Sequence, residues 1–262
     1  MEKHSRHDKW LAQDYAKASD MQWRQAIEAL SRCDYRACDS ILDVGCGDGK
    51  ITHYVAKQLE HGNIIGIDLV ENMVNFAQTH YGEQANIRFL QMSADDIGFN
   101  QRFDFILSFS CLHWVADQTK VWNDFYQHLL PRGTVLCGFQ VDHEHFWDTV
   151  FAHQQVPQWQ SYFVDFHDPY HHFTLNEMVS FIEKAGFYLP RIDEIHHVEY
   201  FDTQNKLMDF FLSWVPQFRH LESPIREQFA QHVMDDYMNK IHPQMREHAG
   251  VRIKRYIIEA EK

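Results

Sequence analysis

The chain has 262 residues, of which 45% are hydrophobic and 23% charged, a composition that argues against a disordered protein. Lys and Arg number 24 against 37 Asp and Glu, so the formal net charge is -13. Because that average field repels polyanions, we expect no nucleic-acid partner.

The cysteines and the hydropathy pattern indicate a cytoplasmic protein. The five cysteines are odd in number and form no C-x-x-C pair, which predicts reduced thiols. The opening residues, 1–15, contain no apolar segment of the kind found in a signal peptide. No run approaches ~18 consecutive apolar residues, so we expect no membrane-spanning segment and no membrane partner.

Helical and strand patterns alternate through the first half of the chain. Residues 8–32 predict a helix or a helix pair, with candidate buried positions at Trp10, Leu11, Ala26, Ile27 and Leu30. Strands are then expected at 40–44, 63–68, 86–92, 103–109 and 133–141, the last introduced by the turn pair Pro131 and Gly133. Helices are expected at 50–59, at about 71–80 and through Trp122 to Leu130. Such alternation predicts an α/β fold with a parallel sheet covered on both faces.

The second half of the chain is less regular. Residues 142–172 are rich in histidine and aromatic residues and match neither helical nor strand periodicity. A capping box at Thr174 and Glu177 predicts a helix that ends before Gly186. Strands are expected at 191–201 and 251–260, and helices across 204–247 with breaks near Pro216 and Pro224. No internal repeat or low-complexity linker occurs, so we expect no second independent domain.

The strongest motif is DVGCGDG at 43–49, directly after the first expected strand. Glycines there allow a sharp turn and let a ligand approach the backbone. A dinucleotide fingerprint would need glycine where Lys50 stands. Asp43, two residues before the first glycine, would repel a pyrophosphate but suits the ammonium group of S-adenosylmethionine. The motif therefore favours S-adenosylmethionine, although a lone G-x-G-x-G is more often only a turn.

Two further signals lie at the ends of the next strands. Asp68 follows the second strand, where a carboxylate can accept hydrogen bonds from both ribose hydroxyls, and Leu69 and Met73 suit the adenine face. Taken alone, Asp68 fits a helix cap equally well. Ser93 to Asp96 follow the third strand, where an acceptor can meet the adenine amino group. All three signals share the carboxyl edge of the predicted sheet.

These motifs resemble those of class I S-adenosylmethionine-dependent methyltransferases, and the resemblance covers residues 40–140. Within that class the chain is most similar to the group of trans-aconitate, malonyl-carrier-protein and juvenile hormone acid methyltransferases, above all the last. The shared stretches are DVGCGDG, the run at 107–118, WQSYF, DPYHH at 168–172, FLSWVPQF at 211–218 and DDYM at 235–238.

The resemblance implies a Rossmann-like, seven-stranded, mostly parallel sheet with a helical and aromatic lid. The expected segments are N-terminal helices over the active site (1–39), an S-adenosylmethionine-binding core (40–141), a lid insertion (142–173) and a C-terminal part of the core with a helical lid (174–262). The product would be S-adenosylhomocysteine. The family usually has Asp where Ser93 stands, so either Ser93 or Asp95 takes the adenine contact. The predicted cofactor residues are Asp43, Gly45, Cys46, Gly47, Gly49, Asp68, Leu69, Met73, Ser93, Ala94, Asp95, Ser108 and Phe109.

The acceptor is predicted to be the carboxylate of a small hydrophobic or dicarboxylic acid. Enzymes that methylate base amines carry N/D-P-P-Y after the fourth strand, where this chain has Ser108-Phe109-Ser110-Cys111. A carboxylate, with a reference pKa of about 4, is already an ionised nucleophile and needs no general base. The alternatives are a carrier-protein-bound acyl group and a non-catalytic S-adenosylmethionine-binding module.

The resemblance also implies residues that hold the acceptor. Trp114 and Gln22 match positions that donate hydrogen bonds to the substrate carboxylate, and His113 either polarises the acid or packs. The aromatic residues of 142–172 either line a lid or pack it onto the core. No H-E-x-x-H motif occurs, so we expect no metal. The oligomeric state is left open between a monomer and a weak dimer.

Overall fold

The computed structural model describes residues 12, 13, 15, 19–143, 145–241 and 243–262. The chain forms two compact units. The first contains the described residues up to Phe139 together with 172–193 and 256–262, and the second contains 140–171 and 194–255. Trp10 and Leu11, predicted to be buried, lie outside the described residues.

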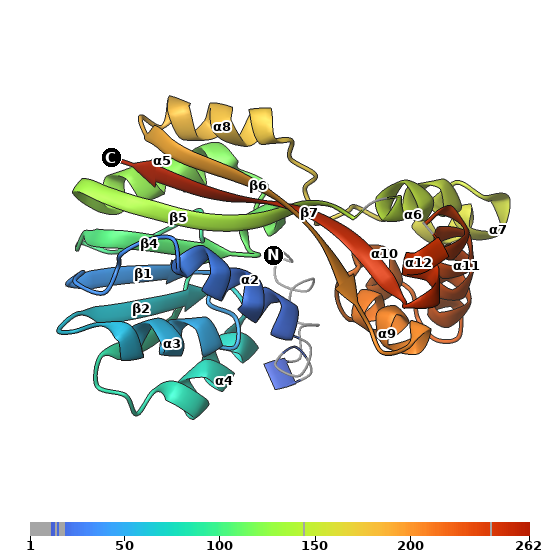
Figure 1. Cartoon of the computed structure of the whole chain (residues 1–262), viewed down its shortest axis with the longest axis horizontal. Helices are drawn as coiled ribbons and strands as arrows, with labels where there is room; N and C mark the ends of the chain where they lie inside the picture. Colours follow the sequence, from blue (N-terminus) through green and yellow to red (C-terminus); the bar gives the residue numbers. More distant parts are fainter. Residues whose placement is uncertain (1–11, 14, 16–18, 144, 242) are drawn as a thin grey trace. The chain divides into compact units, whose positions relative to one another are not determined.

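One seven-stranded sheet has the strand order β3-β2-β1-β4-β5-β7-β6, which confirms the predicted α/β fold class (Figure 1). The pairs β1–β2, β2–β3, β1–β4 and β4–β5 are parallel. The order reverses at β1, so the connections after β1 and β4 leave in opposite directions. Open α/β sheets bind ligands in the crevice at that point. The strands are β1 (Ser40–Val44), β2 (Asn63–Asp68), β3 (Ile87–Gln91), β4 (Phe103–Phe109), β5 (Leu129–His143), β6 (Tyr188–Tyr200) and β7 (Gly250–Glu261).

The central strands are mostly apolar because both faces of the sheet are covered. Ile41, Leu42 and Val44 of β1 have no solvent exposure, and Ile106 and Leu107 of β4 are equally buried. Strands buried on both faces need continuous apolar runs rather than alternation. This is the reason that β1, β2 and β4 were predicted with their observed bounds.

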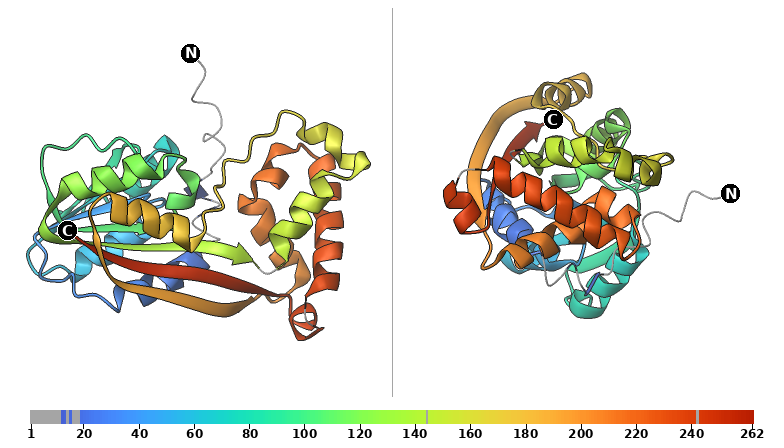
Figure 2. Two further views of the ribbon diagram at one scale, coloured as in Figure 1. Left: turned by 90° about the horizontal axis from the view of Figure 1, so that it is seen from above. Right: turned by 90° about the vertical axis from the view of Figure 1, so that its right-hand side faces the viewer.

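Helices lie on both faces of the sheet in the first unit (Figures 1 and 2). α2 packs against α3, and α5 packs against α8. The predicted capping box is present, since the backbone N–H of Thr174 donates to Glu177 at 2.8 Å. At the other end of this helix, Gly186 takes a φ of +102°. The helices are α2 (Asp20–Leu30), α3 (Lys50–Gln58), α4 (Glu71–Tyr81), the 3-10 turn η1 (Leu112–Trp114), α5 (Gln118–His128) and α8 (Leu175–Lys184).

β5 begins at Leu129, four residues before the predicted start. The predicted turn at Pro131 and Gly133 is absorbed into the strand as an irregularity: its pairing register with β4 shifts there, and Arg132 takes a φ of +67°. The backbone N–H of Arg132 donates to Lys262 at 3.0 Å, and the N–H of Lys262 donates to Gly133. The local turn signal was overridden by a partner at the far end of the sequence.

The second unit has its own aromatic core. Residues 146–154, which lack periodicity, form a helix that buries the rings of Phe146 and Trp147. Phe146 stacks on Phe211 with ring centroids 3.8 Å apart, and Trp147 contacts Tyr170 and Trp214. Trp147, Trp159 and Tyr170 are buried in this packing. The helices are α6 (Phe146–Gln154), α7 (Pro157–Gln160), η2 (Ser161–Phe163), α9 (Gln204–Trp214), α10 (Pro216–His220), α11 (Ile225–Lys240) and α12 (Pro243–Glu247).

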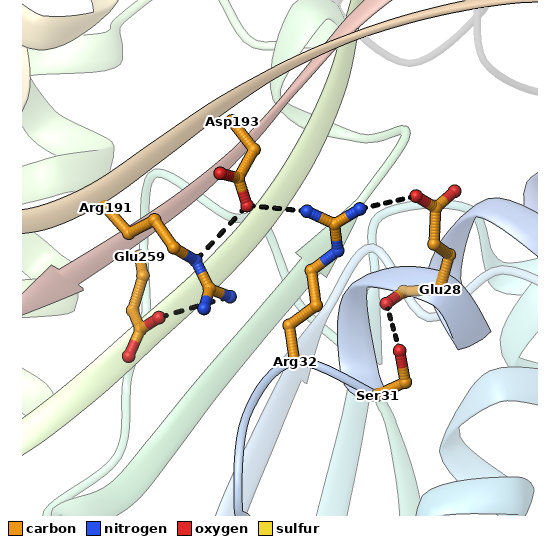
Figure 3. A network of polar contacts seen from close by, with 6 residues as sticks. All are labelled: Glu28, Ser31, Arg32, Arg191, Asp193 and Glu259. Carbon is orange, nitrogen blue, oxygen red and sulfur yellow. Dashed lines mark hydrogen bonds and ion pairs between the residues drawn. The ribbon is translucent and has the colours of Figure 1, made fainter.

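A network of ion pairs ties the carboxyl end of α2 to strands β6 and β7 within the first unit (Figure 3). Arg32 donates to Glu28 at 2.6 Å and to Asp193 at 2.7 Å. Arg191 pairs with Asp193 and with Glu259. The network joins residues 161 positions apart and fixes the end of the helix on the sheet.

None of the helices in the described part of the chain is long and apolar enough to cross a membrane.

Candidate functional site

The loop after β1 is built from glycines in the left-handed region of backbone space. Gly45, Gly47 and Gly49 have φ values of +76°, +54° and +80°, which side chains of L-residues rarely tolerate. The N–H groups of Gly45 and Cys46 both donate to the carbonyl of Ile67 at the end of β2. These hydrogen bonds hold the loop against β2, and α3 begins after the loop at Lys50.

Two of these glycines also have no room for a side chain. A Cβ on Gly45 would lie 2.4 Å from Cβ and Sγ of Cys111, and one on Gly49 would lie 2.6 Å from Ala77. At Gly47, by contrast, the nearest atom is Cε1 of Tyr15 at 3.6 Å. Gly45 and Gly49 therefore allow other parts of the protein to pack closely on the loop. At Gly47 the backbone lies beside the ring of Tyr15 with no side chain between them.

Asp68 joins the loops that follow β1 and β2. Its Oδ2 accepts a hydrogen bond from the backbone N–H of Gly47, and its Oδ1 accepts one from Val70, both at 2.9 Å. These bonds fix the carboxylate at the carboxyl edge of the sheet. A carboxylate has about four acceptor sites, so the fixed group can still receive both hydroxyls of a ribose.

Asp43 lies beneath the loop and is 2% exposed. Its Oδ2 accepts a hydrogen bond from the hydroxyl of Thr52 at 2.6 Å. Burial raises the pKa of Asp43 to about 7, the Thr52 hydrogen bond opposes the rise, and the charges of Asp68 and Asp48 add to it. A positive charge near the loop would be stabilised by this carboxylate, but the direct contact with an ammonium group stays a prediction.

A pocket at the carboxyl edge of the sheet brings together segments that follow β1, β2, β3 and β4. Nine of the predicted site residues line it, namely Gly45, Gly47, Asp68, Leu69, Met73, Ser93, Ala94, Phe109 and Trp114. The remaining lining residues are Tyr15, Val70, Met92, Ser110, Cys111 and Val115. All fifteen belong to the first unit.

The remaining predicted residues lie outside this lining. They are Asp43, Cys46, Gly49, Asp95, Ser108, His113 and Gln22. Ser108 is fully buried and donates from its hydroxyl to the carbonyl of Val44 at 3.0 Å, so it links β4 to β1. Cys46 is 5% exposed. Their direct contact with a cofactor stays a prediction.

After β3 the pocket is lined by Ser93 and Ala94, whereas Asp95 lies outside it. The hydroxyl of Ser93 donates to Oδ1 of Asp95. Of the two residues predicted for the adenine contact, Ser93 is therefore the one beside the pocket, and Asp95 orients it.

Trp114 and His113 lie on the η1 turn, but only Trp114 lines the pocket. His113 is 7% exposed, and its ring packs against that of Trp114 with centroids 5.4 Å apart. Gln22 lies on α2 outside the lining, and its buried Oε1 accepts no hydrogen bond from the described part of the chain.

Six lining residues are absent from the sequence-based prediction. Val70, Met92, Ser110 and Cys111 lie within two residues of a strand end, so including such residues would have found them, whereas Val115 follows the η1 turn. Ser110 has a φ of +52°, which turns the chain into η1. Tyr15 carries no local signal, because its approach to Gly47 is a contact between residues distant in the sequence.

Two titratable groups of the pocket lining, Cys111 and Tyr15, have raised pKa values. Burial raises the pKa of Cys111 to about 12, and the charge of Asp68 adds to the rise. Burial, followed by the charges of Asp48 and Asp68, raises the pKa of Tyr15 well above its usual range. Both groups stay protonated at neutral pH.

The pocket fits an adenosyl group joined to an amino acid. Gly45 and Gly47 expose backbone to it, Asp68 supplies acceptors for a sugar diol, and Leu69 and Met73 supply an apolar wall. Among the described residues no group of three or more His, Cys, Asp or Glu is arranged to hold a metal ion.

Comparison with protein families matches residues 41–133 to a methyltransferase domain. Juvenile hormone acid O-methyltransferase of Drosophila melanogaster is 27% identical over 250 residues, which cover 89% of this chain and 77% of that protein. The enzyme of the same name from Bombyx mori is 28% identical over 187 residues, with 66% and 67% covered. Malonyl-[acyl-carrier protein] O-methyltransferase of Acetivibrio thermocellus is 26% identical over 140 residues, about half of each chain.

Solved structures share the fold. The YcgJ protein of Bacillus subtilis superposes with a TM-score of 0.64 at 18% identity, covering 92% of this chain and 98% of that one. Phosphoethanolamine N-methyltransferase 2 of Haemonchus contortus, solved in complex with S-adenosyl-L-methionine, gives a TM-score of 0.59 at 18% identity, with 96% and 56% covered.

Proposed function

Because the chain is a class I S-adenosylmethionine-dependent methyltransferase, we propose that it transfers the methyl group to the carboxylate of a small acid. The bound cofactor supplies an electrophilic methyl carbon on a sulfonium sulfur. The protein's task is to orient the acceptor oxygen behind that carbon and to exclude water.

One observation carries the choice of acceptor: apart from Asp68, which we assign to the ribose, the described pocket lining holds no side chain that takes a proton at neutral pH. It contains no Lys, Arg or His. Tyr15 and Cys111 are held protonated, and both oxygens of Asp68 accept backbone hydrogen bonds. An amine or an alcohol has to lose a proton to become nucleophilic, whereas a carboxylate is ionised already.

Trp114 is the residue we assign to the acceptor within the lining. An indole N–H donates one hydrogen bond and carries no charge, so it can fix a carboxylate oxygen without taking away its nucleophilicity. Gln22 is the second donor suggested by the similarity to juvenile hormone acid O-methyltransferases. It lies outside the lining, and its contribution requires its own test.

A carrier-protein-bound acyl group is the second candidate acceptor. It is supported by the similarity to malonyl-[acyl-carrier protein] O-methyltransferase over about half of the chain. The net charge of -13 counts against it, because docking of an acidic carrier needs a basic surface.

A panel of acceptors with methyl-labelled cofactor tests the proposal. The panel contains fatty, isoprenoid and dicarboxylic acids, the alcohols and amines with the same carbon skeletons, and malonyl groups on a carrier protein. We expect label in a free acid with an apolar body. Label only in alcohols or amines would exclude a carboxylate acceptor, and label only on the carrier would favour the second candidate. Cofactor binding without any transfer would indicate a non-catalytic module.

A further inference from the structure

Gln118, the first residue of α5, is a buried polar residue directly behind the pocket lining. It is 1% exposed, and its side-chain amide nitrogen donates two hydrogen bonds of 2.7 Å, to the carbonyls of Leu112 and Val115. These carbonyls lie on the two sides of Trp114. One amide group therefore holds both ends of the η1 turn.

Two backbone hydrogen bonds also close the turn. The backbone N–H of Trp114 donates to Cys111 at 2.9 Å, and that of Val115 donates to Leu112 at 3.1 Å. A single 3-10 turn with two backbone bonds is a marginal structure. The amide of Gln118 adds a second donor to the carbonyl of Leu112 and donates to that of Val115.

The opposite atom of the same amide shows that this arrangement costs free energy. Oε1 of Gln118 is buried and accepts no hydrogen bond from the described residues. Rotating the amide by half a turn would not help, because the oxygen would then face two carbonyls. A buried acceptor without a donor is unfavourable, and an apolar side chain of the same length would avoid it.

We propose that Gln118 is a positioning residue for methyl transfer, which holds the η1 turn so that Trp114 and Cys111 keep their places in the pocket lining. Gln118 touches neither reactant and acts through Trp114. The inference rests on the proposed function only for the identity of the acceptor, because Trp114 shares its pocket with Gly45 of the glycine loop and with Asp68 at the end of β2.

The first test is a double-mutant cycle in the full chain. Gln118→Met removes both donors at nearly constant length, and Trp114→Phe removes the indole. We expect Gln118→Met to lower kcat/KM for the acceptor about tenfold, since small displacements of positioning groups cost that much or more. In the Trp114→Phe background the same change should cost less than about twofold, because the residue through which it acts is gone. Equal losses in both backgrounds would overturn the proposal.

The second test uses pH and does not depend on how stable the Met variant is. In Gln118→Glu an ionised carboxylate repels the two carbonyls, whereas the protonated acid donates one hydrogen bond to them. We expect activity relative to wild type to recover severalfold from pH 8 to pH 6. If Gln118→Glu is folded and its activity relative to wild type is the same at pH 8 and pH 6, the positioning role is contradicted.

Gln84→Met is the matched control. The amide of Gln84 donates to Asn86 at 2.8 Å in the turn before β3, at the opposite end of that strand from the pocket. It should leave kcat/KM unchanged.

The affinity for S-adenosylhomocysteine, measured by titration calorimetry, separates the two proposals. If no carboxylic acid is methylated, the proposed acceptor is wrong, yet non-additive effects of Gln118 and Trp114 on this affinity still support the positioning role.

Discussion

The carboxylate of Asp68 accepts a hydrogen bond from the backbone N–H of Gly47 at 2.9 Å, which connects the acid after β2 to the glycine loop after β1. This contact pre-orients the acid before any ligand arrives. The loop and the acid are predicted to act as one binding element, with the backbone of Gly47 on one side of the cofactor and the acid on its sugar.

Asp68→Asn should therefore weaken binding of S-adenosylhomocysteine. The substitution keeps the shape, but it replaces one acceptor oxygen by a donor and removes the charge. Hydrogen bonds to charged groups contribute about 1.5–3 kcal/mol, so we expect the dissociation constant to rise roughly 10- to 100-fold in calorimetry. Asp96→Asn is the control, because Asp96 is exposed and pairs with Lys120 away from the pocket. Equal affinities for wild type and Asp68→Asn would refute the ribose contact.

Gly45→Ala should destabilise the whole first unit. The residue has a φ of +76°, and a Cβ would lie 2.4 Å from Cys111. Strained backbone and overpacking together cost about 2–4 kcal/mol of unfolding free energy. Denaturant unfolding measures this loss. Gly98→Ala is the matched control, since a Cβ there would meet nothing within 4 Å. The account of the loop fails if the two variants are equally stable.

The raised pKa of Asp43 predicts that the free energy of unfolding falls as the pH rises. Its folded pKa of about 7 lies above the unfolded value of 3.8, so between these values the folded state holds a proton that the unfolded state has lost. The contribution of this group to stability therefore falls from about pH 4 to pH 7 and is constant above. The full difference is on the order of a few kcal/mol.

The measurement compares wild type with Asp43→Asn, which cannot ionise. The free energy of unfolding of the variant minus that of wild type should increase between pH 5 and pH 8. A difference that is independent of pH would show that Asp43 titrates normally. Cationic cofactor should lower the pKa of Asp43, so binding near pH 6.5 is expected to release a proton, detectable by calorimetry in buffers of different ionisation enthalpy.

Trp114→Phe should raise the KM for the acid acceptor about tenfold, because one hydrogen bond to a charged group is lost while the ring is kept. The affinity for S-adenosylhomocysteine should change less than the acceptor KM. Trp23→Phe serves as the control, since Trp23 packs edge-on against Tyr54 on α2 and α3 and does not line the pocket. If KM is unchanged, the indole does not bind the acceptor.

The sheet and the cofactor loop were predictable because their signals are local. Mostly apolar runs gave β1, β2 and β4 with their observed bounds, and the ends of β1 and β2 located Gly47 and Asp68. The glycine loop, Asp68 and Ser93 lie side by side because the carboxyl ends of parallel strands share one edge of the sheet.

What the sequence could not predict depends on partners far along the chain. β5 begins early because Leu129 pairs with Phe103 and Arg132 bonds to Lys262, and α6 forms where Phe146 stacks on Phe211. Tyr15 belongs to the same category. Its approach to Gly47 is a tertiary contact that leaves no periodicity in the sequence.

The most direct test of the central claim is the chemical nature of the transferred methyl group. The protein is incubated with methyl-labelled cofactor and an apolar carboxylic acid, and the isolated product is treated with mild alkali. A methyl ester releases its label as volatile methanol, which is the result this account predicts. Label that stays in an alkali-stable product, as an ether or a methylated amine would, contradicts transfer to a carboxylate.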